Sequence, residues 1–146
     1  MALALKDSGL KIALVESRPP MPLPPDDSWD SRIYAISPGS AEFLQYFGVW
    51  QALDDARITP VYKMAVFGDD SAARLDFSAY DIGLTGLAFI IENRQLQTAG
   101  WAARKRSKKH IKIFCPAQCS SIAWTESHAD LHLADGSVLQ TALIVG

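Results

Sequence analysis

The chain has 146 residues, of which 49% are apolar and 21% are charged, and its formal net charge is −2. This length and balance fit one ordinary globular domain and exclude a disordered or fibrous protein. The longest apolar runs, at residues 12–15 and 87–91, are too short to cross a bilayer, and no stretch is typical of a signal peptide.

The first predicted elements are a short helix and a strand. Residues 2–8 contain good helix formers, and Gly9 lies where a C-cap glycine would end the helix. Residues 11–16 predict a buried strand that ends on a charged side chain. Five prolines between residues 19 and 25 then predict a loop over 17–30.

The middle of the chain alternates between strands and helices. Residues 30–36 are expected to be extended, and Ser37 followed by proline predicts the start of a helix that runs to about residue 47. A turn at 68–70 separates two predicted strands, 61–67 and 73–77. Four aromatic side chains of this region and the next are expected in the core: Trp50, Phe77, Phe89 and Trp101.

The last part of the chain begins with an apolar strand at 87–91, followed by a helix over 94–106 that Asn93 can cap. The remaining predicted strands lie at 111–114, 120–125, 129–133 and 138–145. The last three are expected to form an antiparallel meander, with Asp135-Gly136 as one of its turns.

Positive charge is concentrated at residues 104–112, which hold six of the fourteen basic side chains: Arg104, Lys105, Arg106, Lys108, Lys109 and Lys112. Such a cluster suits a nucleic-acid or anionic-membrane patch, or a solvated helix end whose cations offset the helix dipole. We favour the helix end, because no aromatic residues are interleaved and the whole chain is acidic. No nucleic-acid partner is therefore expected.

Cysteine and histidine are too few for a convincing metal site. Cys115 and Cys119 are four residues apart, and no second pair of ligands stands at suitable spacing. His128 and His132 share a predicted strand but stand well apart on it. We expect no metal and reduced thiols in a cytoplasmic chain.

Residues 2–16 have the pattern of the second half of a dinucleotide-binding βαβ unit. This pattern consists of a helix, a glycine and an apolar strand that ends on an acidic residue. In such units the acid at the end of the second strand holds ribose hydroxyls, because a carboxylate accepts two O–H bonds at once. Glu16 occupies that position. A strand that simply ends on a surface carboxylate would produce the same pattern.

Three further stretches carry motifs. Residues 30–37 read DSRIYAIS and lead into a helix that ends in Phe47-Gly48-Val49-Trp50; residues 90–97 read IIENRQLQ; and residues 114–118 read FCPAQ. In this order the motifs resemble the ubiquinone-biosynthesis hydroxylases, which are FAD-dependent aromatic monooxygenases with the p-hydroxybenzoate hydroxylase fold. Phe47 replaces the family's usual leucine.

The resemblance covers nearly the whole chain and implies an α/β fold of mixed α+β character. It implies an incomplete FAD-binding Rossmann-like domain, at residues 1–60 and 92–146, and part of a β-sheet substrate domain at 61–91. The resemblance implies that the family's Gly-x-Gly-x-x-Gly motif lies before residue 2, that its Ala-Asp-Gly motif begins directly after Gly146, and that its Gly-Asp-Ala-x-His motif lies later still. We therefore expect an internal fragment of a longer hydroxylase that is not a competent enzyme by itself.

The resemblance implies six cofactor-binding residues: Glu16, Arg32, Arg94, Gln97, Gln118 and Cys119. Glu16 would bind the adenosine ribose. Arg32 would approach the FAD phosphates, and Arg94 would contact the phosphate or the ribityl chain, assisted by hydrogen bonds from Gln97. The backbone of the last two residues would approach the adenine.

The sequence leaves a plain structural explanation for most of these residues. Arg32 could form a surface ion pair with Asp30, and Arg94 could lie in a solvated first turn of its helix. Gln118 and Cys119 could serve only in strand packing.

No catalytic acid, base or nucleophile stands out, in keeping with a family whose cofactor carries the chemistry. FAD reduced by NAD(P)H would use O₂ to hydroxylate a polyprenylated phenol. The resemblance also implies peripheral association with the inner membrane, and an open apolar strand edge predicts oligomers. The alternatives are a flavoprotein oxidoreductase with another aromatic substrate and a non-catalytic binding module that uses residues 104–112.

Overall fold

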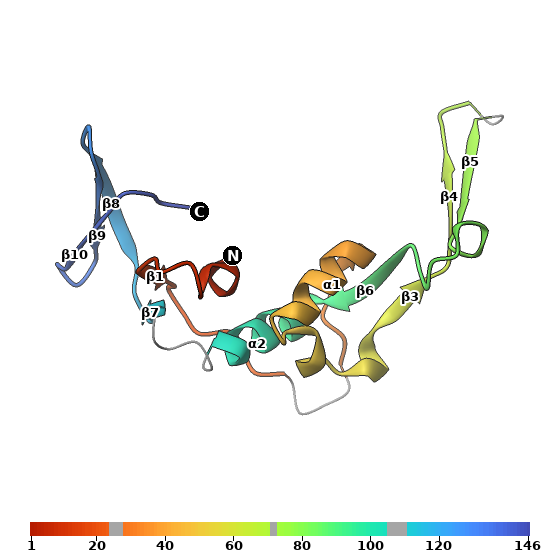
Figure 1. The fold of residues 1–146 in the computed structure, drawn as a ribbon, viewed down its shortest axis with the longest axis horizontal. Coiled ribbons are helices and arrows are strands. Elements are labelled where there is room, and N and C mark those ends of the chain that lie inside the picture. The colour runs from red at the N-terminus through yellow and green to blue at the C-terminus, as the bar shows by residue number, and fades with distance from the viewer. Residues whose placement is uncertain (24–27, 71–72, 105–110) are drawn as a thin grey trace. The chain divides into compact units, whose positions relative to one another are not determined.

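The structure is a computed structural model that describes residues 1–23, 28–70, 73–104 and 111–146. It separates into two compact units, one made of Met1–Pro19 with Ser107–Gly146 and the other of Pro20–Arg106 (Figure 1). The domain boundaries inferred from the family resemblance, after residues 60 and 91, stay a prediction.

The first unit contains a parallel strand pair and a three-stranded meander. A 3₁₀ turn at Ala2–Leu5 precedes β1 (Ile12–Val15), which pairs in parallel with β7 (Ile111–Phe114). Strands β8 (Cys119–Trp124), β9 (Ala129–Leu133) and β10 (Val138–Thr141) form an antiparallel sheet in the order β10-β9-β8. Among the described residues of this unit, the buried side chains are those of Ile111, Ala129 and Leu133.

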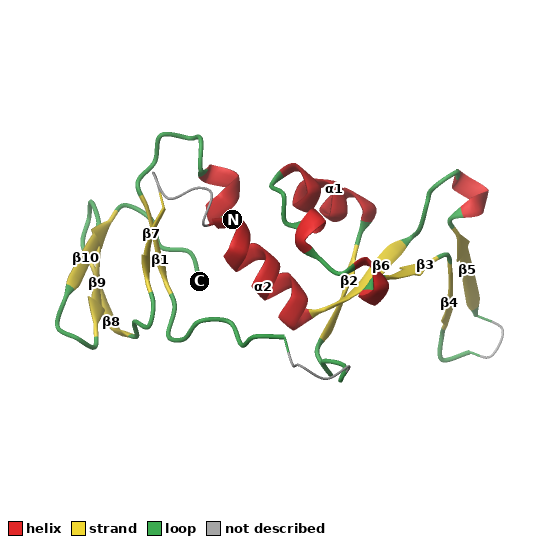
Figure 2. Cartoon of the chain, turned by 90° about the horizontal axis from the view of Figure 1, so that it is seen from below, coloured by secondary structure: helices red, strands yellow, loops and turns green. Residues whose placement is uncertain are grey.

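The second unit is built on the antiparallel sheet β2-β6-β3, whose strands span Ile33–Ile36, Ala88–Glu92 and Thr59–Val61. Helices α1 (Pro38–Tyr46) and α2 (Asn93–Arg104) both contact β6 (Figure 2). Strands β4 (Lys63–Phe67) and β5 (Arg74–Ser78) form a separate hairpin. Short 3₁₀ turns lie at Trp50–Ala52, Asp55–Arg57 and Tyr80–Ile82.

The core of the second unit lies around β6, the central strand of its sheet. Ile91 is fully buried at 0% exposure, and Ala88 on the same strand is buried as well. Ala99 and Ala103 are the buried apolar residues of α2, one helical turn apart on one face. Small side chains on this face allow the helix to lie close to its neighbours.

Several elements differ in extent from the sequence prediction. The helix expected at 2–8 is only a 3₁₀ turn, the strand expected at 61–67 is divided between two sheets, and the last strand ends at Thr141. Phe77 was expected in the core but is 48% exposed, because β5 pairs only with β4 within the described residues. Four basic residues of the 104–112 cluster lie outside the described residues.

The N-terminus of α1 confirms the predicted proline-containing cap. The Ser37 hydroxyl oxygen accepts the Ser40 N–H at 3.2 Å, and Pro38 opens the helix. Gly48 ends the segment with φ +70°, a conformation that favours glycine.

We expect Ser37→Ala to lower the free energy of unfolding by about 1 kcal/mol, because the N–H of Ser40 loses its acceptor. Urea denaturation followed by tryptophan fluorescence measures the change. Ser37→Asp, which keeps an acceptor at the cap, should restore most of the loss. An equal loss in both variants would show that the hydroxyl is needed for something other than capping.

Candidate functional site

In the second unit, the start of β2 and the start of α2 lie side by side. Ile33 is the register partner of Glu92, so the chain before β2 runs next to the chain after β6. The backbone N–H of Asn93 donates to the carbonyl of Arg32 at 2.9 Å. The structure therefore brings together Arg32 and Arg94, which are 62 residues apart in sequence.

Asp30 links the backbones of these two arginines. Its Oδ1 accepts the N–H of Arg32 at 3.1 Å, and its Oδ2 accepts the N–H of Arg94, also at 3.1 Å. The Nε of Arg94 lies 3.6 Å from the same Oδ2, and only 9% of the Asp30 side chain is exposed. The ion pair that the sequence suggested between Asp30 and Arg32 is thus made by Arg94 instead.

Behind this contact lies a buried carboxylate. Glu92, at the end of β6, is 4% exposed, and its oxygens accept the Nε of Arg57 at 2.7 Å and the Nη2 of Arg57 at 2.9 Å. It also accepts the backbone N–H of Asp30 at 2.5 Å and the side-chain amide of Gln95 at 3.4 Å. Two nearly parallel N–H donors from one guanidinium make this a strong, geometrically specific pair.

Arg57 and Gln95 tie further loops to this carboxylate. The Nη2 of Arg57 also donates to the carbonyl of Ser28 at 2.8 Å, and its guanidinium lies 4.2 Å from the ring centre of Trp29. The side-chain oxygen of Gln95 accepts the N–H of Asp54 at 2.9 Å. Three separate segments therefore meet at Glu92.

The hydrogen bonds from Arg57 lower the pKa of Glu92 to about 2 from an ordinary 4.5, against the opposing effect of burial. The carboxylate is therefore ionised at neutral pH and is not a proton donor there. Its role is to hold neighbouring segments in place.

This pKa predicts acid sensitivity. Because the unfolded chain binds a proton at Glu92 at higher pH than the folded chain, stability should be complete above pH 4.5 and fall progressively toward pH 2. Urea midpoints measured between pH 6 and pH 2.5 check this. The slope should be smaller in Glu92→Gln, and an unchanged slope would contradict the prediction.

The arginine side chains themselves are available for a ligand. Arg32 is exposed, and its guanidinium has no partner among the described residues. Arg94 is 30% exposed, and its Nη atoms have no partner in the same part of the chain. Gln97 is exposed on α2, three residues after Arg94. Guanidinium groups with unpartnered N–H edges suit phosphate oxygens.

In the first unit, Glu16 follows β1 at the carboxyl end of the parallel pair. Its N–H donates to the Phe114 carbonyl at 2.9 Å, and its carbonyl accepts the Ala117 N–H at 2.9 Å. Its carboxylate is exposed and accepts the N–H of Ser17 at 2.9 Å. The carboxyl end of a parallel strand is where a nucleotide-binding acid is found in open α/β sheets.

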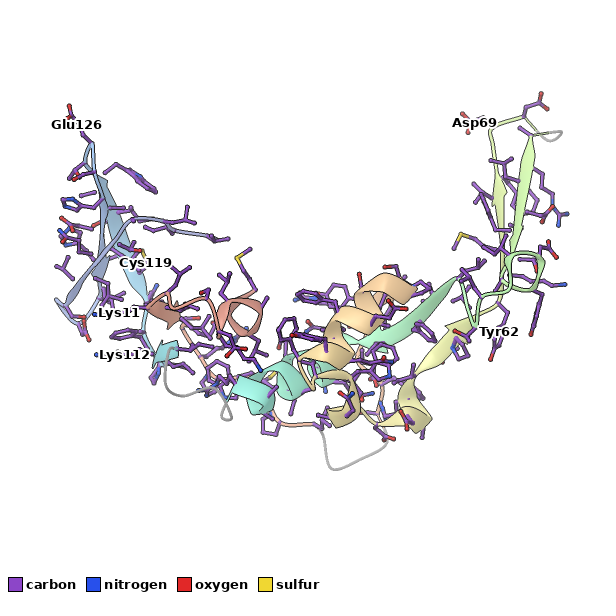
Figure 3. All side chains as sticks on the ribbon, in the orientation of Figure 1. Lys11, Tyr62, Asp69, Lys112, Cys119 and Glu126 are labelled. Atoms are coloured by element: carbon purple, nitrogen blue, oxygen red, sulfur yellow. The ribbon has the colours of Figure 1, made fainter. Side chains whose placement is uncertain are left out.

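Gln118 and Cys119 continue the chain from this point, and both are exposed. Cys119 begins β8, at the opposite end of the β8–β9 hairpin from Glu126 (Figure 3). Its thiol is free and lies 3.6 Å from the Ser121 carbonyl. Among the described residues, no group of three or more side chains is arranged to hold a metal ion.

The six predicted residues thus fall into two groups, one in each unit. Arg32, Arg94 and Gln97 lie near the start of α2, and the other three lie at the end of β1 and after β7. Sequence reasoning missed Arg57 and the roles of Asp30 and Glu92. An apolar strand that ends on an acid did not single out Glu92, because Glu16 follows β1 in the same way and is exposed.

No protein-family model matches the chain. Curated relatives do match it: 3-demethoxyubiquinol 3-hydroxylase of Escherichia coli (strain K12) is 29% identical over 146 residues, which is 100% of this chain and 37% of that protein. The chain is similar in sequence to ubiquinone-biosynthesis hydroxylases. The mitochondrial ubiquinone biosynthesis monooxygenase COQ6 of Mus musculus is 28% identical over 93% of this chain and 30% of its own length.

The fold agrees with this relationship. The p-nitrophenol 4-monooxygenase PnpA from Pseudomonas putida DLL-E4 has a TM-score of 0.65 at 14% identity, covering 97% of this chain and 35% of that one. CtdE, solved in complex with FAD and a substrate, has a TM-score of 0.58 at 16% identity over 97% of this chain and 33% of its own. The chain spans about a third of the length of these proteins and has the mixed α/β fold of that part of them.

Proposed function

We propose that this chain forms part of an FAD-dependent monooxygenase that hydroxylates the aromatic ring of a ubiquinone precursor. The observation that carries the proposal is the match over the whole chain to 3-demethoxyubiquinol 3-hydroxylase of Escherichia coli. The likeness of fold to CtdE, which was solved with FAD, supports the choice of cofactor. A related flavoprotein acting on another aromatic compound is the second candidate, supported by the likeness to p-nitrophenol 4-monooxygenase.

The residues present fit FAD. Glu16 has an exposed carboxylate at a strand end, where it can accept ribose hydroxyls. The backbones of Arg32 and Arg94 lie side by side, and within the described residues both guanidinium groups have unpartnered N–H groups, which suit the oxygens of a diphosphate. Gln97 would donate to the ribityl chain, while the backbone at Gln118 and Cys119 would lie near the adenine.

Bound FAD, once reduced by NAD(P)H, would supply the activation of O₂ that ring hydroxylation needs. The contribution of this chain is binding and orientation. Glu92 remains ionised and paired with Arg57, so we assign it no proton transfer. No described side chain of this segment is assigned as catalytic.

The proposed substrate is a polyprenylated phenol, and its apolar tail suggests peripheral association with the inner membrane. Among the described residues, no helix is long and apolar enough to span a bilayer. Strand β1 pairs only with β7 within the described part of the chain, so one of its edges is open. An open strand edge favours pairing with further strands, and on this ground we propose an oligomer.

The test uses the natural protein that carries these residues. Purified with FAD, it should show flavin absorbance and convert a demethoxyubiquinol or related phenol to its hydroxylated product with NAD(P)H and O₂. Product with a different aromatic compound alone would favour the second candidate. The 146-residue chain by itself should not retain stoichiometric FAD. Stoichiometric flavin absorbance in the purified 146-residue chain would contradict this expectation.

Within that protein, Arg32→Ala should weaken FAD binding by roughly 10- to 150-fold, since a hydrogen bond to a charged group contributes roughly 1.5–3 kcal/mol. Flavin fluorescence titration measures the change. Arg74→Ala is the matched control, because Arg74 is exposed on β5 and paired with Asp76. Equal effects in both variants would remove Arg32 from the proposed site.

A further inference from the structure

The least expected feature of the second unit is the position of Asp30. Its carboxylate accepts both the Arg32 N–H and the Arg94 N–H at 3.1 Å. Arg32 directly precedes β2, whereas Arg94 lies in the first turn of α2. With 9% of its side chain exposed, Asp30 is held away from solvent. One buried carboxylate therefore sets the spacing between two backbones.

Asp30 is itself held in place by Glu92. The backbone N–H of Asp30 donates to Oε1 of Glu92, and that carboxylate is fixed in turn by the bidentate contact with Arg57. The Arg57–Glu92 pair is formally neutral, whereas Asp30 with Arg32 and Arg94 carries a net charge of +1. Asp30, Arg32 and Arg94 together therefore keep the net positive charge that attracts an anionic ligand.

The contact with Asp30 uses only one edge of the Arg94 guanidinium. The carboxylate lies 3.6 Å from Nε, and the Nη atoms have no partner among the described residues. A carboxylate on Nε restricts the rotation of the side chain while leaving the opposite edge available. Ordering a flexible side chain before a ligand arrives lowers the entropy cost of binding.

We propose that Asp30 is a positioning residue for FAD: it fixes the backbones of Arg32 and Arg94 and orients the Arg94 guanidinium toward the cofactor's phosphates. This inference rests on the proposed function. Asp30 touches no cofactor atom in this account and acts only through the two arginines.

The test is a double-mutant cycle in the natural FAD-containing protein, with wild type, Asp30→Asn, Arg94→Ala and the double variant. Asp30→Asn keeps the size of the side chain but removes its charge and one of the two acceptors facing backbone N–H groups. We expect FAD to bind about tenfold more weakly in Asp30→Asn. Because part of the Asp30 effect acts through Arg94, the loss in the double variant should be smaller than the product of the two single losses. Asp69→Asn, at the tip of the β4–β5 hairpin (Figure 3), is the control and should bind as wild type does.

Flavin fluorescence titration gives the affinities, and circular dichroism confirms that each variant is folded. Wild-type affinity in folded Asp30→Asn, or effects that multiply in the double variant, would overturn the inference and leave the proposed function standing. A wild-type protein that binds no FAD would overturn both. If Asp30→Asn does not fold, Asp30→Glu replaces it: a purely structural role predicts unchanged affinity in the folded Glu variant, which would also refute the inference.

Discussion

Replacing Glu92 by alanine should lower the free energy of unfolding by about 3–5 kcal/mol, the usual cost of removing one partner of a buried ion pair. The loss is large because the Arg57 guanidinium, whose side chain is only 20% exposed, would lose its carboxylate. The N–H of Asp30 would lose its acceptor at the same time. Since folded domains are stable by about 5–15 kcal/mol, this change alone could unfold the second unit.

Urea denaturation followed by tryptophan fluorescence measures this loss, because Trp29 and Trp50 lie in the same unit. Glu42→Ala is the matched control: Glu42 is exposed on α1, and its replacement should change stability by less than about 0.5 kcal/mol. Glu92→Gln keeps the shape of the side chain, and its loss in free energy of unfolding should lie between those of Glu92→Ala and Glu42→Ala. A loss below about 1 kcal/mol in Glu92→Ala would show that Arg57 finds another partner or solvent.

Ile91→Ala should be the second most damaging substitution, costing about 2–5 kcal/mol. Ile91 is the largest fully buried side chain among the described residues, at 0% exposure on the central strand of the sheet. Truncation removes three carbon atoms and leaves a cavity that well-packed neighbours cannot fill.

Ile33→Ala on β2 provides a matched control in the same sheet. Ile33 has the same side chain but is 55% exposed, so its truncation should cost less than about 1 kcal/mol. Urea midpoints at pH 7 separate the two variants. Equal losses would mean that the exposed face of β2 is covered in the natural protein.

Local signals in the sequence predicted most elements of the fold. Ser37 with Pro38 predicted the start of α1, and the structure has the cap hydrogen bond that this motif implies. Asp135-Gly136 predicted a turn of the meander, where Gly136 adopts φ +86° and the Asp135 carboxylate accepts the N–H of Ser137. Each of these features depends on residues within a few positions of one another.

Predictions that depended on distant neighbours were less successful. The run at 61–67 was predicted as one strand because its apolar pattern is continuous, but pairing partners divide it: β3 pairs with β6 and β4 with β5. Phe77 was assigned to the core from its chemistry alone, and its exposure depends on the absence of a third strand beside β5 within the described residues. Local pattern carries no information on which partner a strand will find.

The candidate site shows the same division. The motifs at residues 30–37 and 90–97 indicated the family and identified Arg32 and Arg94, and the match to ubiquinone-biosynthesis hydroxylases confirms that resemblance. The assignment of individual cofactor contacts stays a prediction. Nothing in the local sequence indicated that one carboxylate would join the two arginines.

By itself, the sequence determined most of the strands and helices, the cap of α1, the turn at Asp135-Gly136 and the family that the chain resembles. Only the tertiary structure decided that Glu92 pairs with Arg57, 35 residues away, and that Asp30 caps the start of α2, 64 residues away. Caps and turns arise from neighbours along the chain, whereas a buried charge is stable only where folding brings a distant partner to it.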